Sequence, residues 1–166
     1  MARPERARGA SLLELLVTAA VLAVLATAVI PLYRWEEKRR REHHLKVSLQ
    51  TIRTAIDQYN KYMKEGLIQP QDIEQCAIAG ALDTCWPLTL EELVEGVQVG
   101  DLHSTETKTL KFLQRIPVDP FTGEAEWGQR SFQDDWDASS WGGENVYDVY
   151  SLSQSRALDD TYYRDW

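Results

Sequence analysis

Glu14 is the side chain in this sequence whose position most needs a chemical explanation. It follows a short basic stretch that ends at Gly9, and it is the last charged residue before an apolar run from Leu15 to Tyr33. As a helix, these 19 residues would rise about 28 Å, close to the thickness of the hydrocarbon core of a bilayer. An ionised carboxylate beside such a run costs about 3 kcal/mol in hydrocarbon, so the chemistry we expect of it is charge pairing.

The other reactive side chains form no catalytic pattern. The sequence has no glycine-rich phosphate loop, no histidines at metal-ligating spacing and no nucleophile motif. Three clustered carboxylates, Asp134, Asp135 and Asp137, lie among loop-forming residues and are interpreted as surface charge. We therefore expect a protein that is not an enzyme.

The N-terminal junction resembles that of type IV pilin and pseudopilin precursors. The resemblance is carried by the basic leader, by Gly9, by Glu14 and by the apolar run that follows. It implies that residues 1–9 are a leader peptide, that prepilin peptidase cuts between Gly9 and Ala10, and that Ala10 is then N-methylated. Glu14 matches the glutamate that the family carries as the fifth residue of the mature chain. Ala10 departs from the Phe or Met usual in the family.

This resemblance gives Glu14 a role in assembly. The new amine at Ala10 would be cationic at neutral pH, and Glu14 of one subunit would pair with the amine of a neighbour and set the register. A carboxylate in the first helical turn also suits the helix dipole. The alternative is that Glu14 only caps the helix near lipid headgroups.

Two other readings of the N-terminus stay open. An ordinary secretory signal peptide would use Ala26-Thr27-Ala28 as its cleavage site and release a soluble product. The second reading is a plain membrane anchor. In that case the five basic residues of segment 34–41, after the apolar run, outnumber the three basic residues of the leader before it. Charge counting would then keep the C-terminal side in the cytoplasm, whereas the family resemblance places it outside.

One continuous helix is expected from Leu12 to Glu65, with Gly66 as its C-cap. Residues 10–33 would be its transmembrane or filament-core segment, and residues 34–66 its amphipathic half. In that half, apolar side chains recur at alternating spacings of four and three: Leu45, Leu49, Ile52, Ile56, Tyr59 and Met63. This stripe is expected to lie against a globular head, and a short coiled coil is the alternative.

Residues 67–166 are expected to form one small periplasmic head. The fold class is α+β, pilin-like, with the long N-terminal helix packed against a small C-terminal antiparallel β-sheet. Local patterns predict a helix in Pro87–Val94 with a Thr89–Glu92 capping box, a second helix over Glu106–Gln114, and strands around Ala125–Trp127 and Val146–Leu152.

Cys76 and Cys85 are the only cysteines of the chain. Their spacing is not a metal motif. In an oxidising compartment they would close a small disulfide loop. Two buried thiols are the alternative.

The tail narrows the resemblance to the major pseudopilins of type II secretion systems. The residues that carry it are Pro117–Gly123, Trp127, Tyr147–Ser151, Ala157–Thr161 and Trp166. In that family the last loop typically binds calcium, which makes Asp159 and Asp160 the candidate ligands. Ser153–Arg156 departs from the usual pattern, and a solvated acidic loop is the alternative.

The resemblance implies a structural subunit of a pseudopilus that drives protein export across the outer membrane. Its partners would be further copies of itself in a helical filament, minor pseudopilins, the inner-membrane assembly platform and prepilin peptidase. It would span the bacterial inner membrane once, with its head in the periplasm. Residues 119–166 carry the whole net charge of −8, which argues against nucleic acid as a partner. A type IV pilus subunit for adhesion or motility and an anchored or soluble periplasmic binding domain are the alternatives.

Overall fold

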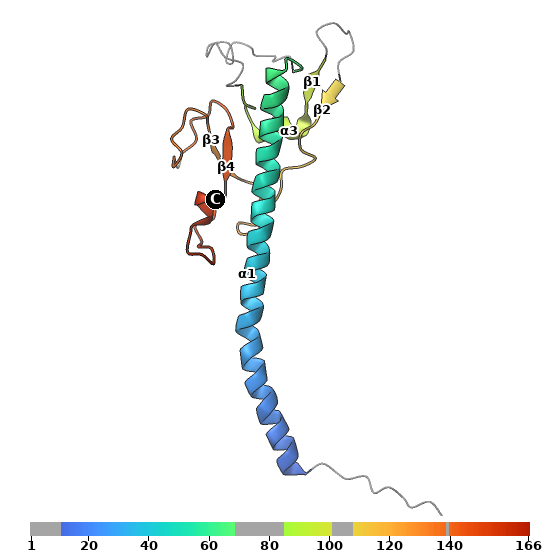
Figure 1. Cartoon of the computed structure of the whole chain (residues 1–166), viewed down its shortest axis with the longest axis vertical. Coiled ribbons are helices and arrows are strands. Elements are labelled where there is room, and N and C mark those ends of the chain that lie inside the picture. Colours follow the sequence, from blue (N-terminus) through green and yellow to red (C-terminus); the bar gives the residue numbers. More distant parts are fainter. Residues whose placement is uncertain (1–10, 69–84, 101–107, 139) are drawn as a thin grey trace, which may run out of the picture. The chain divides into compact units, whose positions relative to one another are not determined.

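The computed structural model describes residues 11–68, 85–100, 108–138 and 140–166, without the side chains of residues 28–32 (Figure 1). The chain is α+β and divides into two compact units, between Arg40 and Arg41. Its elements are α1 (Leu12–Lys64), α3 (Leu90–Glu95), β1 (Val97–Val99), β2 (Lys108–Leu110), β3 (Gly128–Arg130), β4 (Asp148–Tyr150) and the 3-10 helix η2 (Tyr163–Asp165).

The long helix α1 covers 53 residues, which confirms the span expected from the sequence to within one residue. Its last turn is followed by Gly66, whose φ of 69° is a left-handed conformation that glycine adopts without strain. Gly66 N–H donates to the carbonyl of Met63, and Leu67 N–H donates to the carbonyl of Tyr62. These two bonds form a Schellman motif, which satisfies carbonyls that the last turn would otherwise leave open.

In the first unit, every side chain of α1 from Leu12 to Thr27 is exposed. The large apolar ones include Leu12, 83 % exposed, and Val24, 70 % exposed. Within the residues that the structure describes, no helix combines the length and the hydropathy that crossing a membrane requires.

In the second unit, the apolar stripe of α1 is the centre of the core. All six predicted positions are buried: Leu45, Leu49, Ile52, Ile56, Tyr59 and Met63. They join one cluster with Leu93 of α3, Val149 of β4 and Tyr163 of η2. The stripe is therefore covered by the head of the same chain, as expected, and each such side chain contributes roughly 2 kcal/mol by leaving water.

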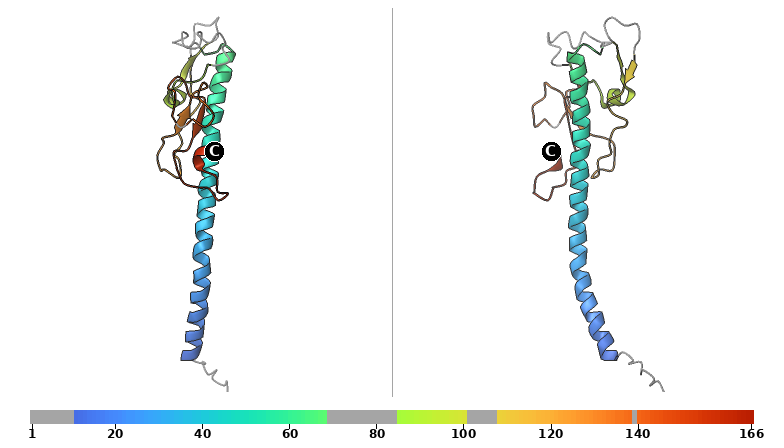
Figure 2. Two further views of the ribbon diagram at one scale, coloured as in Figure 1. Left: turned by 90° about the vertical axis from the view of Figure 1, so that its left-hand side faces the viewer. Right: turned by 45° about the vertical axis from the view of Figure 1, so that its right-hand side comes forward.

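Among the described residues, the strands form two small antiparallel sheets, whereas the sequence led us to expect one. β1 pairs with β2, β3 pairs with β4, and each strand has three residues. Figures 1 and 2 show the two pairs flanking the C-terminal half of α1. Because two-stranded sheets of this length are not stable on their own, both pairs depend on packing against α1.

Two of the local predictions are confirmed, one is displaced and one is wrong. α3 begins three residues after the start of the predicted Pro87–Val94 and ends one residue beyond it, and β4 lies within Val146–Leu152. β3 begins just after the predicted Ala125–Trp127. The helix predicted over Glu106–Gln114 is wrong, because residues 108–110 form β2 and pair with β1 instead. Pairing with a neighbouring strand here outweighs a weak helix propensity.

The predicted capping box opens α3. Thr89 is the N-cap, and its hydroxyl accepts a hydrogen bond from Glu92 N–H at 3.3 Å. The return bond differs from the usual pattern, because Glu92 Oε2 accepts from Leu88 N–H at 2.9 Å. Glu92 Oε1 accepts in turn from the hydroxyl of Tyr59 at 2.8 Å. The cap of α3 is thus also its polar link to α1.

Candidate functional site

Glu14 lies in the first turn of α1 and is exposed, with exposed leucines on both sides of it. Leu13 is 71 % exposed and Leu15 is 67 % exposed. Gly9 and Ala10, the predicted sites of cleavage and N-methylation, lie outside the described residues. Glu14 is therefore a carboxylate surrounded by exposed apolar side chains, and its role in assembly stays a prediction.

The cysteine prediction is only half covered by the structure. Cys85 is fully buried, and its carbonyl accepts a hydrogen bond from Asn60 Nδ2 at 2.8 Å. Cys76 lies outside the described residues. The disulfide and the two-thiol alternative therefore both remain predictions.

The predicted calcium residues lie in a turn that is organised by Thr161. Asp159 Oδ1 accepts hydrogen bonds from the hydroxyl of Thr161 at 2.6 Å and from its N–H at 3.2 Å. These two bonds hold the pKa of the Asp159 carboxyl below its ordinary value. Asp160 has a left-handed φ of 65° and is exposed.

This donor set fits a calcium ion only in part. Calcium takes six to eight oxygen ligands, and among the described residues no three His, Cys, Asp or Glu side chains are grouped as a metal site. Asp159 and Asp160 would need backbone carbonyls and water to complete a shell. Ser153–Arg156 is the segment that differs from the family pattern. In it, Arg156 donates a hydrogen bond to the hydroxyl of Tyr162 at 2.7 Å, and its guanidinium lies 4.6 Å from the centroid of the Tyr162 ring. Calcium binding by Asp159 and Asp160 therefore stays a prediction.

The tail is fastened to α1 by Glu42. Its Oε1 atom accepts from Leu158 N–H at 2.8 Å and from the Tyr163 hydroxyl at 3.0 Å. Burial and the Glu42 carboxylate raise the pKa of Tyr163 well above its ordinary value. The phenol therefore stays protonated and acts as a donor at any physiological pH.

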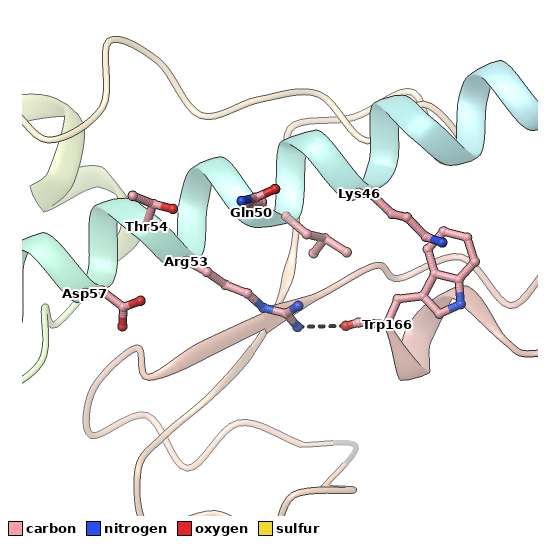
Figure 3. Close-up of a pocket in the computed structure, with 7 residues that line it drawn as sticks. Lys46, Gln50, Arg53, Thr54, Asp57 and Trp166 are labelled. Atoms are coloured by element: carbon pink, nitrogen blue, oxygen red, sulfur yellow. Dashed lines mark hydrogen bonds between the residues drawn. The ribbon is translucent and has the colours of Figure 1, made fainter.

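A second fastening lies about one turn further along α1. Lys46 Nζ lies 4.2 Å from the ring centroid of Trp166, whose indole N–H donates to Thr161 Oγ1 at 2.8 Å. Figure 3 shows Lys46 and Arg53 reaching from α1 toward Trp166. They line an open groove of about 600 Å³ together with Leu49, Gln50, Thr54, Asp57 and Trp166.

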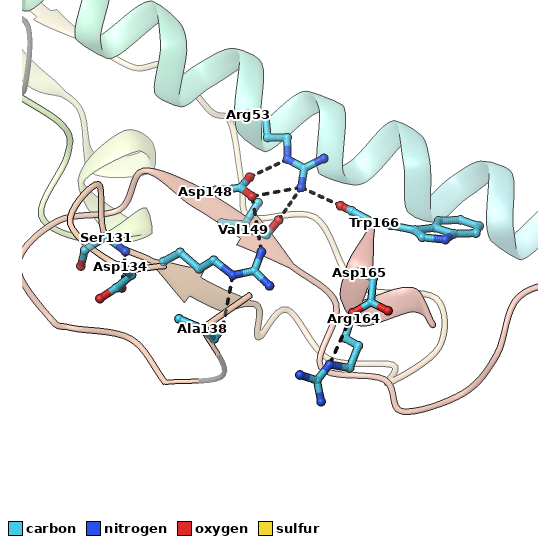
Figure 4. A network of polar contacts seen from close by, with 10 residues as sticks. Arg53, Ser131, Asp134, Ala138, Asp148, Val149, Arg164, Asp165 and Trp166 are labelled. Atoms are coloured by element: carbon cyan, nitrogen blue, oxygen red, sulfur yellow. Dashed lines mark hydrogen bonds and ion pairs between the residues drawn. The ribbon is translucent and has the colours of Figure 1, made fainter. Parts of the chain in front are cut away.

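Arg53 is the centre of the polar network in Figure 4. It donates to both carboxylate oxygens of Asp148, at 2.7 and 3.3 Å, and to the carbonyls of Val149 and Trp166, at 3.0 and 2.7 Å. Arg130 approaches the same carboxylate at 3.6 Å. The fork of one guanidinium therefore ties α1 to β4 and to the end of the chain. Sequence spacing offered no signal for this contact, since Arg53 and Asp148 are 95 residues apart.

The signature segment Pro117–Gly123 is a turn held by Asp119. This buried carboxylate accepts from Phe121 N–H at 2.7 Å and from the hydroxyl of Ser151. The turn places the ring of Phe121 on Tyr163, with centroids 3.9 Å apart. The segments that carry the family resemblance therefore contact one another through Asp119, Phe121 and Ser151, and they support the tail that Glu42 and Arg53 hold.

No protein family model, no curated protein and no solved structure matches this chain. The functional assignment therefore depends on its own residues.

Proposed function

We propose that this protein is a pseudopilin, the major structural subunit of a type II secretion pseudopilus. The observation that carries the proposal is the contrast within α1. Its first part exposes apolar side chains around Glu14, while its second part is buried in a head of the same chain. Exposed apolar surface costs about 25 cal/mol per Å², so the first part needs lipid or neighbouring helices around it.

In this proposal the first part of α1 has two environments. As a precursor, the chain is pilin-like and spans the bacterial inner membrane once, with residues 1–9 as leader and the head in the periplasm. After cleavage between Gly9 and Ala10 and N-methylation of Ala10, the helices of many copies pack in the core of a filament. Close packing between helices supplies the free energy of assembly, since lipid is already as apolar as the helix.

Glu14 sets the register of that packing. Its carboxylate pairs with the N-terminal amine of a neighbouring copy, and an unpaired charge would be costly in an apolar core. Packing alone tolerates sliding between apolar helices, whereas an ion pair selects one alignment. This is the use of a buried polar pair that is best documented for packed helices.

The head follows the helix because Glu42 and Arg53 bind the tail to α1. Filament growth then moves the heads outward and pushes folded proteins through an outer-membrane channel. Minor pseudopilins, the inner-membrane assembly platform and prepilin peptidase are the partners that such a cycle needs. A calcium ion held by Asp159, Asp160 and backbone carbonyls would add rigidity to the tail.

The experiment is the intact mass and N-terminal sequence of the protein from native membranes. A chain that starts at methylated Ala10 is expected, and Gly9→Leu should keep the full precursor mass. Loss of secretion in a deletion strain, with motility unchanged, would separate a pseudopilin from a pilus subunit. A mature chain that starts just after Ala26–Ala28, or an intact Met1, would contradict the proposal and favour a periplasmic binding domain.

A further inference from the structure

The connection between β3 and β4 exposes an unusual density of aromatic side chains. Trp136 is 87 % exposed, and three further rings are between 39 and 47 % exposed: Phe132, Trp141 and Tyr147. We name residues 131–138 and 140–147 the aromatic loop. Large aromatic side chains contribute most of the free energy in protein interfaces, and exposed clusters of them mark docking surfaces.

The loop is held in one conformation by its own polar groups. Asp134 Oδ2 accepts from Ser131 N–H at 2.6 Å and from Gly142 N–H at 3.1 Å (Figure 4 shows Ser131 and Asp134). The indole N–H of Trp141 donates to the carbonyl of Asn145 at 2.8 Å. Because these bonds are already made, a partner would not have to order the loop on binding.

The base of the loop is packed on the head. Tyr147 lies edge-on to Trp86 with ring centroids 4.9 Å apart, and Phe132 lies edge-on to Tyr147 at 5.3 Å. Phe132, four residues before Trp136, is thus packed on the head, while Trp136 itself stays 87 % exposed. The supported rings explain how a loop with two glycines in sequence, Gly142 and Gly143, can still present a defined face.

The negative charge of the aromatic loop favours a partner with basic side chains. It contains four carboxylates and no basic residue, and Trp136 stands between Asp135 and Asp137. Both of these carboxylates are exposed. Aromatic rings beside carboxylates bind guanidinium groups well, because the ring attracts the cation while the carboxylate takes its N–H groups.

The same chain carries a segment of matching chemistry. Residues 34–41 of α1 hold five bases and two acids, and Arg34, Arg39 and Arg40 are exposed. Trp35, 68 % exposed, adds an aromatic ring to this basic segment. Arginine and tryptophan are the residues most enriched at the energetic centres of interfaces.

We propose that the aromatic loop of one copy docks on the basic segment 34–41 of a second copy. The inference depends on the proposed function only because a filament brings copies together. It adds what the apolar helices cannot supply, which is a contact between the head of one copy and the helix of another. Opposite charges would steer the heads as they meet and oppose wrong alignments.

A photo-crosslinking amino acid in place of Trp136 in the full chain tests this directly. Two full-length versions with different affinity tags, only one of which carries the photo-crosslinking residue, are co-expressed, irradiated in membranes, purified through both tags in turn and mapped by mass spectrometry. The expected product is a dimer with both tags, in which position 136 of one copy is joined to residues 34–41 of the other. A crosslink within one chain, a crosslink to any other segment or the absence of a dimer would overturn the docking model.

Charge reversal gives a second measurement that does not depend on a photoproduct. Asp135→Arg with Asp137→Arg, or Arg39→Glu with Arg40→Glu, should each reduce the assembled fraction about tenfold, and combining the two pairs should recover most of it. Glu126→Arg reverses an exposed acid outside the loop and is the matched control. A loss in Glu126→Arg as large as that of either charge-reversed pair, or no recovery in the combined variant, would refute the pairing.

Different results would contradict the docking model and the pseudopilin proposal. If the chain starts at methylated Ala10 and filaments form, but the charge-reversed variants assemble normally, the docking model is wrong and the pseudopilin proposal stands. If the leader is kept and the Trp136 crosslink to a second copy still forms, the pseudopilin proposal is wrong and the docking contact is real.

Discussion

Tyr163 donates its phenolic hydrogen to Glu42 Oε1 across 3.0 Å, and the two residues are 121 positions apart in the sequence. The ring of Tyr163 is fully buried and stacks on Phe121. The same oxygen of Glu42 also accepts from Leu158 N–H. One carboxylate of α1 thus holds both the loop and the 3-10 helix at the end of the chain.

Tyr163→Phe should therefore lower the free energy of unfolding by about 1 kcal/mol, since it leaves the ring in place and removes one partly buried hydrogen bond. Urea unfolding of the purified chain measures this loss. Glu42→Gln completes a double-mutant cycle, and a coupling energy well above the experimental error is expected. Tyr147→Phe, at a ring that is 44 % exposed, is the control, and an equal loss in both variants would argue against the Glu42 bond as the cause.

Gly128 is the position in β3 that no side chain can take. A Cβ built there would overlap the ring of Tyr150, its cross-strand partner in β4. The ring also lies under Arg130, whose guanidinium is 4.3 Å from the ring centroid. Gly128→Ala should destabilise the protein by about 2–3 kcal/mol, measured by thermal unfolding. The double variant with Tyr150→Ala should lose less than the sum of the two single losses, and strict additivity would disprove the clash.

Helical periodicity was the part of this fold that the sequence could predict. The stripe from Leu45 to Met63 and the end of α1 near Gly66 follow from spacing and from one glycine, and the capping box of α3 is a local pattern. Such features depend on residues within a few positions of one another. They are therefore readable before the fold is known.

The pairing of distant segments was not predictable in this way. β2 replaced a predicted helix because its partner β1 compensates for a weak local preference. Arg53, Asp119 and Glu42 acquire their roles from residues 32 to 121 positions away, which no spacing rule connects. Asp134 was interpreted as surface charge, although its carboxylate organises the aromatic loop. Gly9, Ala10 and Cys76 lie outside the described residues. Cleavage after Gly9, N-methylation of Ala10 and the Cys76–Cys85 disulfide therefore stay predictions.

Asp134 should make the free energy of unfolding fall as the pH is lowered into the acid range. Backbone N–H groups of Ser131 and Gly142 hold the pKa of its carboxyl below the ordinary value. Because the pKa is depressed in the folded state, this stabilisation is complete above the unfolded pKa near 4 and is lost as the pH falls through the folded pKa. Wild type should therefore lose more stability than Asp134→Asn between pH 6 and the acid limit, measured by urea unfolding at each pH. Asp137→Asn, in the same loop, is the control, and an identical pH profile for Asp134→Asn and wild type would refute the role.

Calcium should raise the melting temperature if Asp159 and Asp160 hold it as the family resemblance implies. A one-site ligand at 100 times its dissociation constant stabilises the folded state by about 2.7 kcal/mol, which is several degrees for a domain of this size. The increase should disappear in Asp159→Ala and in Asp160→Ala. It should also be absent with magnesium at the same concentration, because magnesium demands a stricter geometry. If calcium and chelator give the same melting temperature, the tail is an acidic loop stabilised by Thr161, Glu42 and its aromatic contacts alone.

Glu14→Ala should separate membrane insertion from assembly. Its apolar neighbours are unchanged, so the chain should still be inserted and still be cut after Gly9, but the charge that selects one alignment of the helices is gone. The loss of a buried ion pair that is worth about 3 kcal/mol would lower the assembled fraction at least a hundredfold at equal expression. The assembled fraction is measured by sedimentation after shearing, with N-terminal sequencing of the same sample. Asp57→Ala, at an exposed acid of the same helix outside residues 34–41, is the matched control. Normal filaments and secretion in Glu14→Ala would mean that Glu14 only caps α1, whereas an uncut Glu14→Ala chain would place its role at the peptidase.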